Sequence, residues 1–351
     1  MESSQRIRQI TKLGVSSALH YSGILSRLRA KFMQGGAVIL MYHRILPEAD
    51  ARFDYAPNGM VVTQKVFAAH MRFLSHSYQT ITIAELHEHL NADAIPTRPL
   101  AVVTFDDGWL DNYQNAWPIL QRYHVPATIF IATNFIDGGN WYWLERLKFV
   151  LAHAHKMLAT GKLQGPRRSR LVDGLAALDL LDLAKGYDTK LGHTLARVAQ
   201  HTQKFEEHDR SEFMAQIDEI SELSDLPGSR YFMTWDEVKK LANDGFYIGA
   251  HTRSHVDLTT ITKHEVKEEL GSCKSRLESE LQHPIEHFAY PYGKNNDSVR
   301  TQTENAGFKS SCSTVSGLVN KGSDPHLLNR INLHTAVSPT RAMFAYRLLD
   351  L

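Results

Sequence analysis

The chain has 351 residues, of which 43% are hydrophobic and 22% are charged, and its formal net charge is +1. This length and composition predict a globular protein with one large α/β domain or two smaller domains. The near-neutral charge argues against a general nucleic-acid-binding protein. Two cysteines, Cys273 and Cys312, are too few for a disulfide framework and argue against a cysteine-based zinc site. The 19 histidines, in contrast, supply many metal ligands and proton carriers.

Positive charge is concentrated near the N-terminus. Between Ser3 and Pro47 there is no acidic residue, but there are seven basic ones: Arg6, Arg8, Lys12, Arg27, Arg29, Lys31 and Arg44. Apolar residues recur at helical spacing, which predicts a basic amphipathic helix within residues 1–35. Such a helix either touches an anionic membrane surface peripherally or packs on the domain with its basic face in water. No apolar stretch approaches 18 residues and no signal-peptide pattern is visible, so a cytoplasmic location is expected.

Residues 36–351 predict one domain in which strands alternate with helices. The predicted strands lie at residues 37–43, 100–105, 127–131, 246–250, 287–290, 309–313 and 329–334. The predicted helices lie at residues 63–77, at 83–90, over about a dozen residues toward Tyr123, from the N-cap Thr234 to Gly245, at 263–281 and at 297–305. Strands that alternate with helices predict a parallel sheet with right-handed crossovers.

The alternation is interrupted at about residues 141–230, where almost every pattern is helical. We interpret this segment as a helical insertion that forms its own packed layer beside the active-site mouth. Its first residues, Trp141, Tyr142 and Trp143, suit either stacking on a sugar or burial among helical leucines.

Polar residues follow two of the predicted strands. Asp106 and Asp107 end the strand at 100–105, and His251 and His255 follow the strand at 246–250. In parallel α/β folds, ligands bind at the edge of the sheet where the strands have their carboxyl ends. Taken alone, the aspartates are also good turn residues, and histidine pairs at this spacing arise by chance. Together, one carboxylate and two imidazoles with open positions describe a catalytic divalent-metal site, and the second carboxylate is free to act as a base.

A third polar turn, Tyr290-Pro291-Tyr292-Gly293, follows the predicted strand at 287–290. Its exposed backbone N–H groups could stabilise an oxyanion, and its aromatic rings could stack on a sugar. The alternative is a structural turn with buried tyrosines.

Three segments, in this order, resemble the polysaccharide deacetylases, the NodB-homology domains of carbohydrate esterase family four. They are Thr104–Gly108, His251–His255 and Phe288–Gly293, and the stretches Leu40–Arg44 and Met233–Gly245 are also typical of that family. The resemblance covers residues 37–137 and 231–335. It implies a distorted (β/α) barrel of about seven parallel strands, and a divalent metal that helps to remove N- or O-acetyl groups from carbohydrates.

The resemblance also implies a role for each matching residue. Asp107, His251 and His255 correspond to the metal ligands, with Zn²⁺ the first expectation and other divalent cations as alternatives. Asp106 corresponds to the general base that takes a proton from the attacking water. The backbone N–H of Tyr292 corresponds to the donor that helps to hold the oxyanion.

Two positions depart from the family pattern. Ala289 stands where the family usually has an arginine that pairs with the base, and Arg330 is a candidate to replace that arginine. The family's general acid is a histidine in a late Leu-x-His segment, which His334 matches, although Thr335 replaces the usual acidic neighbour. A late motif with an aspartate and a buried tryptophan is not recognisable around residues 312–324. These departures indicate a divergent branch.

The sequence therefore predicts a metal-dependent hydrolase that deacetylates an N-acetylated or O-acetylated saccharide, in surface-polysaccharide or glycolipid biosynthesis. One alternative is a hydrolase of the same fold that acts on a non-sugar amide or a cyclic imide. Another is an inactive carbohydrate-binding barrel.

Overall fold

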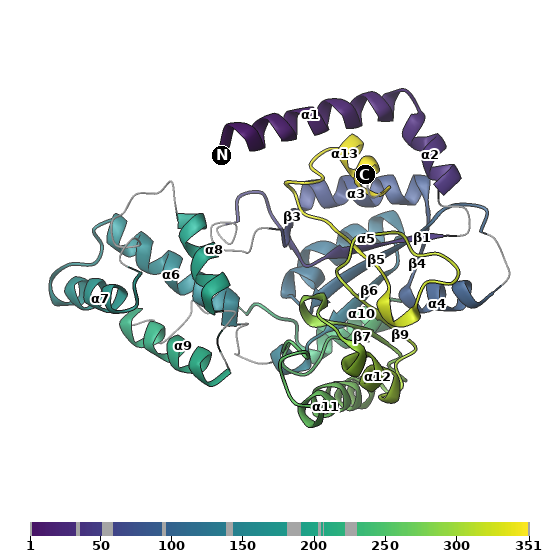
Figure 1. The fold of residues 1–351 in the computed structure, drawn as a ribbon. Coiled ribbons are helices and arrows are strands. Elements are labelled where there is room, and N and C mark those ends of the chain that lie inside the picture. Colours follow the sequence, from purple (N-terminus) through teal and green to yellow (C-terminus); the bar gives the residue numbers. More distant parts are fainter. Residues whose placement is uncertain are drawn as a thin grey trace. The chain divides into compact units, whose positions relative to one another are not determined.

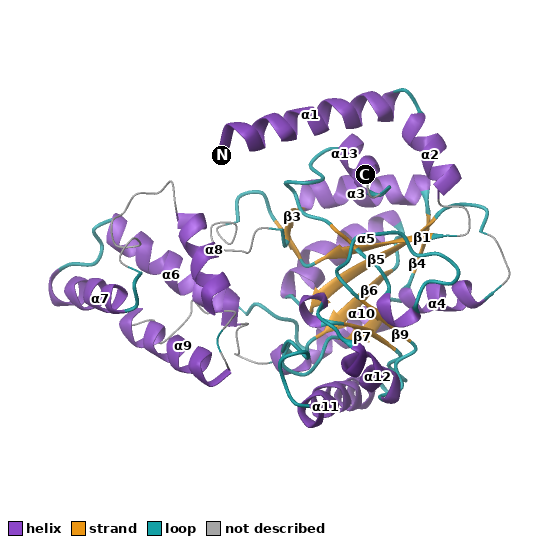
Figure 2. Cartoon of the chain, viewed as in Figure 1, coloured by secondary structure: helices purple, strands orange, loops and turns teal. Residues whose placement is uncertain are grey.

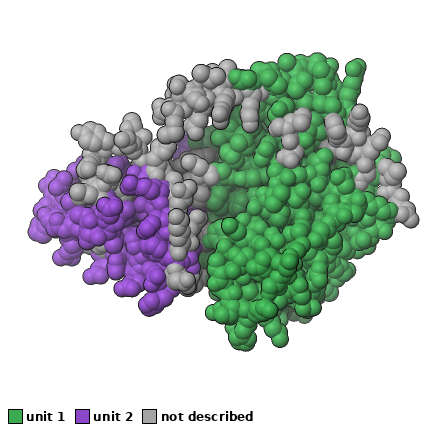
Figure 3. Space-filling model, in the orientation of Figure 1, with its two compact units in different colours: residues 1–48, 59–138, 231–351 green, residues 49–58, 139–230 purple. Residues whose placement is uncertain are grey.

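A computed structural model describes residues 2–32, 36–50, 59–92, 96–137, 143–180, 191–202, 205, 207–221 and 230–349 (Figures 1 and 2). The chain divides into two compact units (Figure 3). The first comprises residues 1–48, 59–138 and 231–351, and the second comprises residues 49–58 and 139–230. Each unit has a hydrophobic core of its own.

The first unit is built on a curled, fully parallel sheet (Figure 2). Seven strands follow one another in the order β10-β1-β5-β6-β7-β8-β9, and β4 pairs with the first half of β5. Their bounds are Ala37–Tyr42 (β1), Gln79–Ile81 (β4), Leu100–Asp107 (β5), Ala127–Ile131 (β6), Tyr247–Ala250 (β7), His287–Ala289 (β8), Ser310–Cys312 (β9) and Ile331–Asn332 (β10). This half-barrel confirms the expected barrel of about seven parallel strands. Two further strands, β2 (Arg44–Leu46) and β3 (Val61–Thr63), form a separate parallel pair.

Side chains of β5 alternate between the two faces of the sheet. Ala101, Val103 and Phe105 belong to the core cluster beneath the outer helices. Leu100 and Val102 belong to a second cluster on the inner face, which helix α4 helps to fill. A strand buried on both faces is expected to be continuously apolar, as this one is until its last residues.

The register of the ladders brings strand ends together at one edge. Asp107 at the end of β5 pairs with Ile131 of β6, and Ile131 pairs with Ala250 of β7. His251, the residue after β7, therefore lies two strands away from Asp107 at the same edge, as the sequence predicts.

The helices of this unit agree with most of the predicted ranges. They are α3 (Gln64–Ser77), α4 (Ile83–Asn91), α5 (Trp117–Tyr123), α10 (Trp235–Asn243), α11 (Lys263–Leu281), α12 (Asp297–Asn305) and α13 (Arg341–Arg347). Thr234 caps α10 in a capping box with Glu237, as expected. The segment before α5 differs from the prediction, because residues Asn112–Ala116 form a π-helix. Two of its amides donate to the backbone of residues 43 and 45.

The N-terminal segment contains two helices and not the single one predicted. Helix α1 covers Glu2–Tyr21 and α2 covers Ile24–Phe32. Gly23 separates them with a φ of +76°, a left-handed conformation that glycine adopts at little cost. Helix α1 packs on α13, and Leu25 of α2 lies in the main core. Arg44, from the basic run, is fully buried and pairs with Asp111. None of the described helices is long and apolar enough to cross a membrane.

The helical insertion contains α6 (Trp143–Ala159), α7 (Gly165–Ala177), α8 (Leu191–Thr202) and α9 (Glu207–Ser221). Its core joins leucines and other apolar residues of all four helices. Trp143 is partly buried against this core, with the Arg210 guanidinium 5.0 Å from its ring centroid. The burial alternative therefore fits Trp143, whereas Trp141 and Tyr142 lie outside the described residues. The expected position of the insertion at the active-site mouth stays a prediction.

Candidate active site

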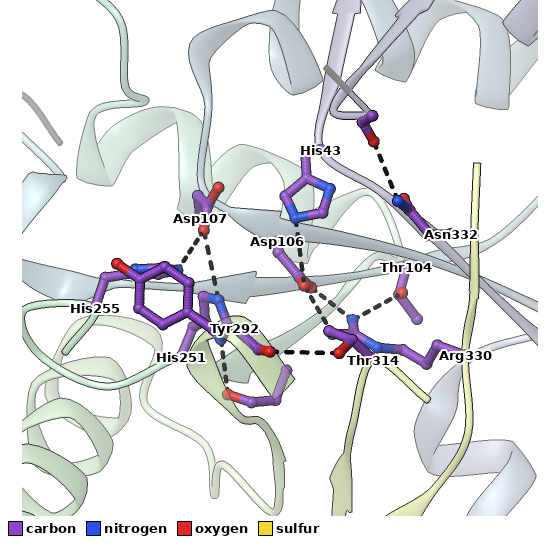
Figure 4. A network of polar contacts seen from close by, with 12 residues as sticks. His43, Thr104, Asp106, Asp107, His251, His255, Tyr292, Thr314, Arg330 and Asn332 are labelled. Carbon is purple, nitrogen blue, oxygen red and sulfur yellow. Dashed lines mark hydrogen bonds and ion pairs between the residues drawn. The ribbon is translucent and has the colours of Figure 1, made fainter. Parts of the chain in front are cut away.

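Three buried side chains converge at the edge of the sheet where the strands have their carboxyl ends (Figure 4). Asp107 Oδ1 lies 3.4 Å from His251 Nε2 and 3.2 Å from His255 Nε2. Asp107 comes from the end of β5, and both histidines come from the loop after β7. In the described part of the chain, this trio is the only group of three or more acidic, histidine or cysteine side chains arranged to hold a metal ion.

The donor set fits a divalent cation of the zinc type. One carboxylate oxygen and two imidazole nitrogens are typical ligands of catalytic zinc. Asp107 Oδ1 is buried and makes no hydrogen bond of normal geometry with the described residues. Among the described residues, the two Nε2 atoms face this oxygen, which a bound cation would explain, because buried carboxylate oxygens are otherwise hydrogen-bonded.

A backbone carbonyl selects the tautomer of His251. His251 Nδ1 lies 2.7 Å from the carbonyl oxygen of Ala289, so Nδ1–H donates to that oxygen. The lone pair of the neutral ring is then on Nε2, which faces Asp107. This arrangement is the usual support for a metal-binding histidine.

A buried carboxylate holds the loop that carries His255. Glu269 on α11 accepts hydrogen bonds from the backbone N–H groups of Arg253 and Ser254, both at 2.9 Å. The Ser254 hydroxyl and the Arg253 side chain also donate to it. His255 itself donates its backbone N–H to the Thr252 hydroxyl at 2.9 Å.

Four residues of this region adopt left-handed backbone conformations. The φ angles are +78° at Asp107, +64° at Thr252, +57° at His255 and +58° at Tyr292. Such conformations are strained for residues with a side chain, and they persist where the surroundings hold them in place. The hydrogen bonds of Glu269 supply that support for the histidine loop.

Asp106 points to the inner face, where Arg330 meets it. The guanidinium donates two parallel hydrogen bonds to the carboxylate, of 2.7 and 2.8 Å, and both side chains are almost fully buried (Figure 4). Arg330 Nε also donates to the carbonyl oxygen of Ser313. Arg330 thus supplies the cation that is missing at Ala289, as the sequence suggested.

Charges around the two aspartates oppose the effect of burial. Burial alone would raise the pKa of Asp106, but the Arg330 guanidinium outweighs it and holds that pKa below its usual value. Burial would likewise raise the pKa of Asp107, but His255 and His251 hold it well below its usual value. Burial lowers the pKa of His251, yet its contacts with Asp107 leave that pKa raised. Both carboxylates are therefore ionised at neutral pH.

His43 is a site residue that the sequence analysis did not single out. It follows β1, and its Nε2 lies 3.9 Å from Asp106 Oδ2 (Figure 4). Burial lowers its pKa although the Asp107 and Asp106 carboxylates act to raise it. A polar residue directly after a buried strand, at the same edge as the aspartates, was the signal that could have identified it.

The structure places Tyr292 beside the candidate ligands. Its ring lies edge-on to His255 with ring centroids 4.8 Å apart, and its carbonyl oxygen accepts a hydrogen bond from Thr314 (Figure 4). Gly293 also has a positive φ, and a Cβ there would collide with Thr314. This tight turn sets the direction of the Tyr292 backbone.

His334 lies two residues after β10. The chain between them stays beside β1, because Leu333 N–H donates to the Met41 carbonyl oxygen. Burial and the nearby Arg347 lower its pKa. Within the described residues, no hydrogen bond or ion pair joins His334 to Asp106 or to the candidate ligands. Its role as the acid therefore stays a prediction.

Comparison with known proteins identifies the family of the chain. The family model "Polysaccharide deacetylase" matches residues 94–161 and 194–311. YxkH of Bacillus subtilis, named for the same family, is 22% identical over 301 residues, which cover 86% of this chain and 72% of YxkH. The poly-β-1,6-N-acetyl-D-glucosamine N-deacetylase of Staphylococcus epidermidis is 29% identical over 128 residues, which cover 34% of this chain and 44% of that relative.

Solved structures show the same fold. The deacetylase PplD of Streptococcus pyogenes, in complex with acetate, gives a TM-score of 0.56 at 19% identity, over 87% of this chain and 96% of that one. IcaB from Ammonifex degensii gives a TM-score of 0.56 at 18% identity, over 89% of this chain and 97% of that one. Since the family model covers more than half of the 351 residues, the chain belongs to the polysaccharide deacetylase family and is an enzyme of that class.

Proposed function

We propose that this enzyme is a metal-dependent deacetylase of an N-acetylated saccharide. The observation that carries the proposal is the buried trio of Asp107, His251 and His255 beside the ion pair of Asp106 and Arg330. The similarity to poly-β-1,6-N-acetyl-D-glucosamine N-deacetylases makes a β-1,6-linked N-acetylglucosamine oligomer the first substrate to test. A role in surface-polysaccharide or glycolipid biosynthesis, a cytoplasmic location and peripheral membrane contact are parts of the same proposal.

The metal would be held by Asp107 Oδ1 and by the Nε2 atoms of His251 and His255. A divalent cation such as Zn²⁺ lowers the pKa of water and polarises a carbonyl oxygen. Asp106, kept ionised by Arg330, accepts the proton of the attacking water. The backbone N–H of Tyr292 donates to the oxyanion of the tetrahedral intermediate.

A second proton must reach the leaving nitrogen, and two histidines are candidates to deliver it. His43 Nε2 lies 3.9 Å from Oδ2 of Asp106, the proposed base. His334, the candidate from the sequence, has no described contact with this network. We propose His43 as the donor, because its Nε2 faces the Asp106 carboxylate.

The test is acetate release from acetylated saccharides, with and without a chelator. We expect release from β-1,6-linked N-acetylglucosamine oligomers, loss of activity after chelation and recovery with Zn²⁺. Activity on cyclic imides in place of saccharides would favour the non-sugar hydrolase. Saccharide binding with stoichiometric metal and no acetate release would favour the inactive binding barrel. His43→Ala and His334→Ala, compared side by side, identify the acid by the larger loss in kcat.

A further inference from the structure

Trp109 stands directly after the Asp106-Asp107-Gly108 turn, and its side chain is only 1% exposed. Its indole Nε1–H donates to Asp107 Oδ2 at 2.8 Å. A buried indole N–H ordinarily finds a polar partner. Here that partner is the carboxylate that faces the two candidate metal-binding histidines.

The bond divides the two oxygens of Asp107 between different partners. Oδ2 accepts from the indole, while Oδ1 faces the Nε2 atoms of His251 and His255. We infer that Trp109 is a positioning residue that makes Asp107 bind the metal through Oδ1 alone. This inference rests on the proposed metal site.

The indole is held tightly enough for this task. The Arg44 guanidinium lies 4.3 Å from its ring centroid, and the Phe232 ring stacks on it with centroids 4.4 Å apart. Arg44 is in turn fixed by a 3.0 Å bond from its Nε to Asp111.

Backbone contacts fix the same turn. Trp109 forms an isolated bridge with Phe232. Leu110 N–H donates to the Tyr231 carbonyl oxygen, and Met233 N–H donates to that of Gly108. Both the ring and the backbone of Trp109 are therefore held beside Asp107 by these contacts.

The consequence concerns the number of open metal positions. A carboxylate that binds through one oxygen takes a single position, so two imidazoles and Asp107 leave room for water and for a carbonyl oxygen. Without the indole N–H, Asp107 Oδ2 is free to bind as well, and a second carboxylate oxygen then takes a position that substrate needs. Outer partners of this kind commonly change metal affinity or activity by about 10–100-fold.

The decisive variant is Trp109→Phe, which keeps an aromatic ring, removes the donor and makes the ring smaller. The matched control is Trp235→Phe. Trp235 is also buried and also has an arginine over its ring, Arg276 at 5.1 Å, but it has no bond to a candidate ligand in the described part of the chain. Zn²⁺ affinity is measured by competition titration of the metal-free proteins, and coordination is read from the visible absorption of the Co²⁺ forms.

We expect Trp109→Phe to shift the Co²⁺ spectrum toward a higher coordination number and to change the Zn²⁺ affinity by about 10-fold or more. Trp235→Phe should match the wild type in both. Equal affinity and equal spectra in all three proteins would overturn the inference. If the wild type binds no stoichiometric metal, the proposed function fails first, so the two failures are distinguishable.

If Trp109→Phe does not fold, the wild type itself provides the test. The chain has five tryptophans, so the indole N–H resonance of Trp109 can be assigned by elimination, with single Trp→Phe variants of the other four. We expect this resonance to be protected from exchange and to shift when Zn²⁺ is added. An indole signal that does not respond to Zn²⁺ would overturn the inference.

Discussion

Replacing Arg330 by methionine tests the most completely buried polar contact of the site. The guanidinium is 0% exposed, and it donates two bonds to Asp106 and one each to the Ser313 carbonyl oxygen and the Thr104 hydroxyl. Methionine keeps much of the side-chain length but leaves the Asp106 carboxylate, itself 2% exposed, without a cation. Breaking a buried pair from one side costs about 3–5 kcal/mol of unfolding free energy.

A double-mutant cycle separates the pair from its surroundings. Asp106→Asn alone also leaves a buried charge unpaired, whereas Asp106→Asn with Arg330→Met removes both charges. We expect the double variant to be more stable than the sum of the single losses predicts, by about 1–3 kcal/mol. Urea unfolding, followed by fluorescence and circular dichroism, gives the free energy of unfolding of each of the four proteins. Single losses that add to within about 0.5 kcal/mol would refute the assigned pairing.

The same variant has a pH signature with a definite sign. Arg330 lowers the pKa of Asp106, so the stability from this group is present above the ordinary carboxyl pKa of about 3.9 and is lost as pH falls through the folded value. Without Arg330, burial raises that pKa, and the acidic limb of kcat/KM should move to higher pH. Arg330→Lys, which restores a cation but not the two-pronged contact, should recover part of the shift.

Four further outcomes test the remaining assignments. His255→Ala should lose most bound metal and nearly all acetate release, and full metal occupancy in that variant would show that the ligand set is wrong. Asp106→Asn should keep its metal and lose about 10²–10⁴-fold in turnover, while loss of metal would show that the two aspartates have been assigned the wrong way round. Glu269→Gln should weaken metal binding and cost about 1–3 kcal/mol of stability, since a buried carboxylate loses acceptor capacity, whereas Glu268→Gln at the exposed neighbouring position should change neither. Burial lowers the pKa of His70 to about 4, so unfolding takes up a proton between that pH and about 6.5. The free energy of unfolding should therefore fall by up to about 3 kcal/mol as the pH drops through this window. An equally steep fall in His70→Gln would show that His70 is not the cause.

The sequence predicted those elements whose patterns are local. The runs at residues 100–105 and 127–131 are apolar on both faces and bounded by turns, and both are strands. The spacing of Thr234 and Glu237 alone predicts where α10 begins. Strands β2, β3 and β4, of three residues each, were not predicted, although the equally short β8 and β9 were.

Contacts between distant segments were harder to predict than the elements. The sequence could name Arg330 as a candidate partner of Asp106, but the contact depends on β10 pairing with β1 and β1 pairing with β5. His43 was missed although its strand was predicted, because a single histidine after a strand forms no spaced ligand pattern. Glu269 could not have been found, since its role depends on how α11 packs under the histidine loop.

The distance along the chain between Asp106 and Arg330 has a consequence for synthesis. They lie 224 positions apart, so at about 5–20 residues per second a ribosome adds the counterion roughly 10–45 s after the carboxylate. Until then, burying Asp106 means dehydrating a charge with no partner, which is costly. We therefore expect the carboxyl end of β5 to stay hydrated until Arg330 and β10 have been synthesised. Pairing of β10 with β1 then brings the guanidinium to Asp106 and completes the sheet around the site.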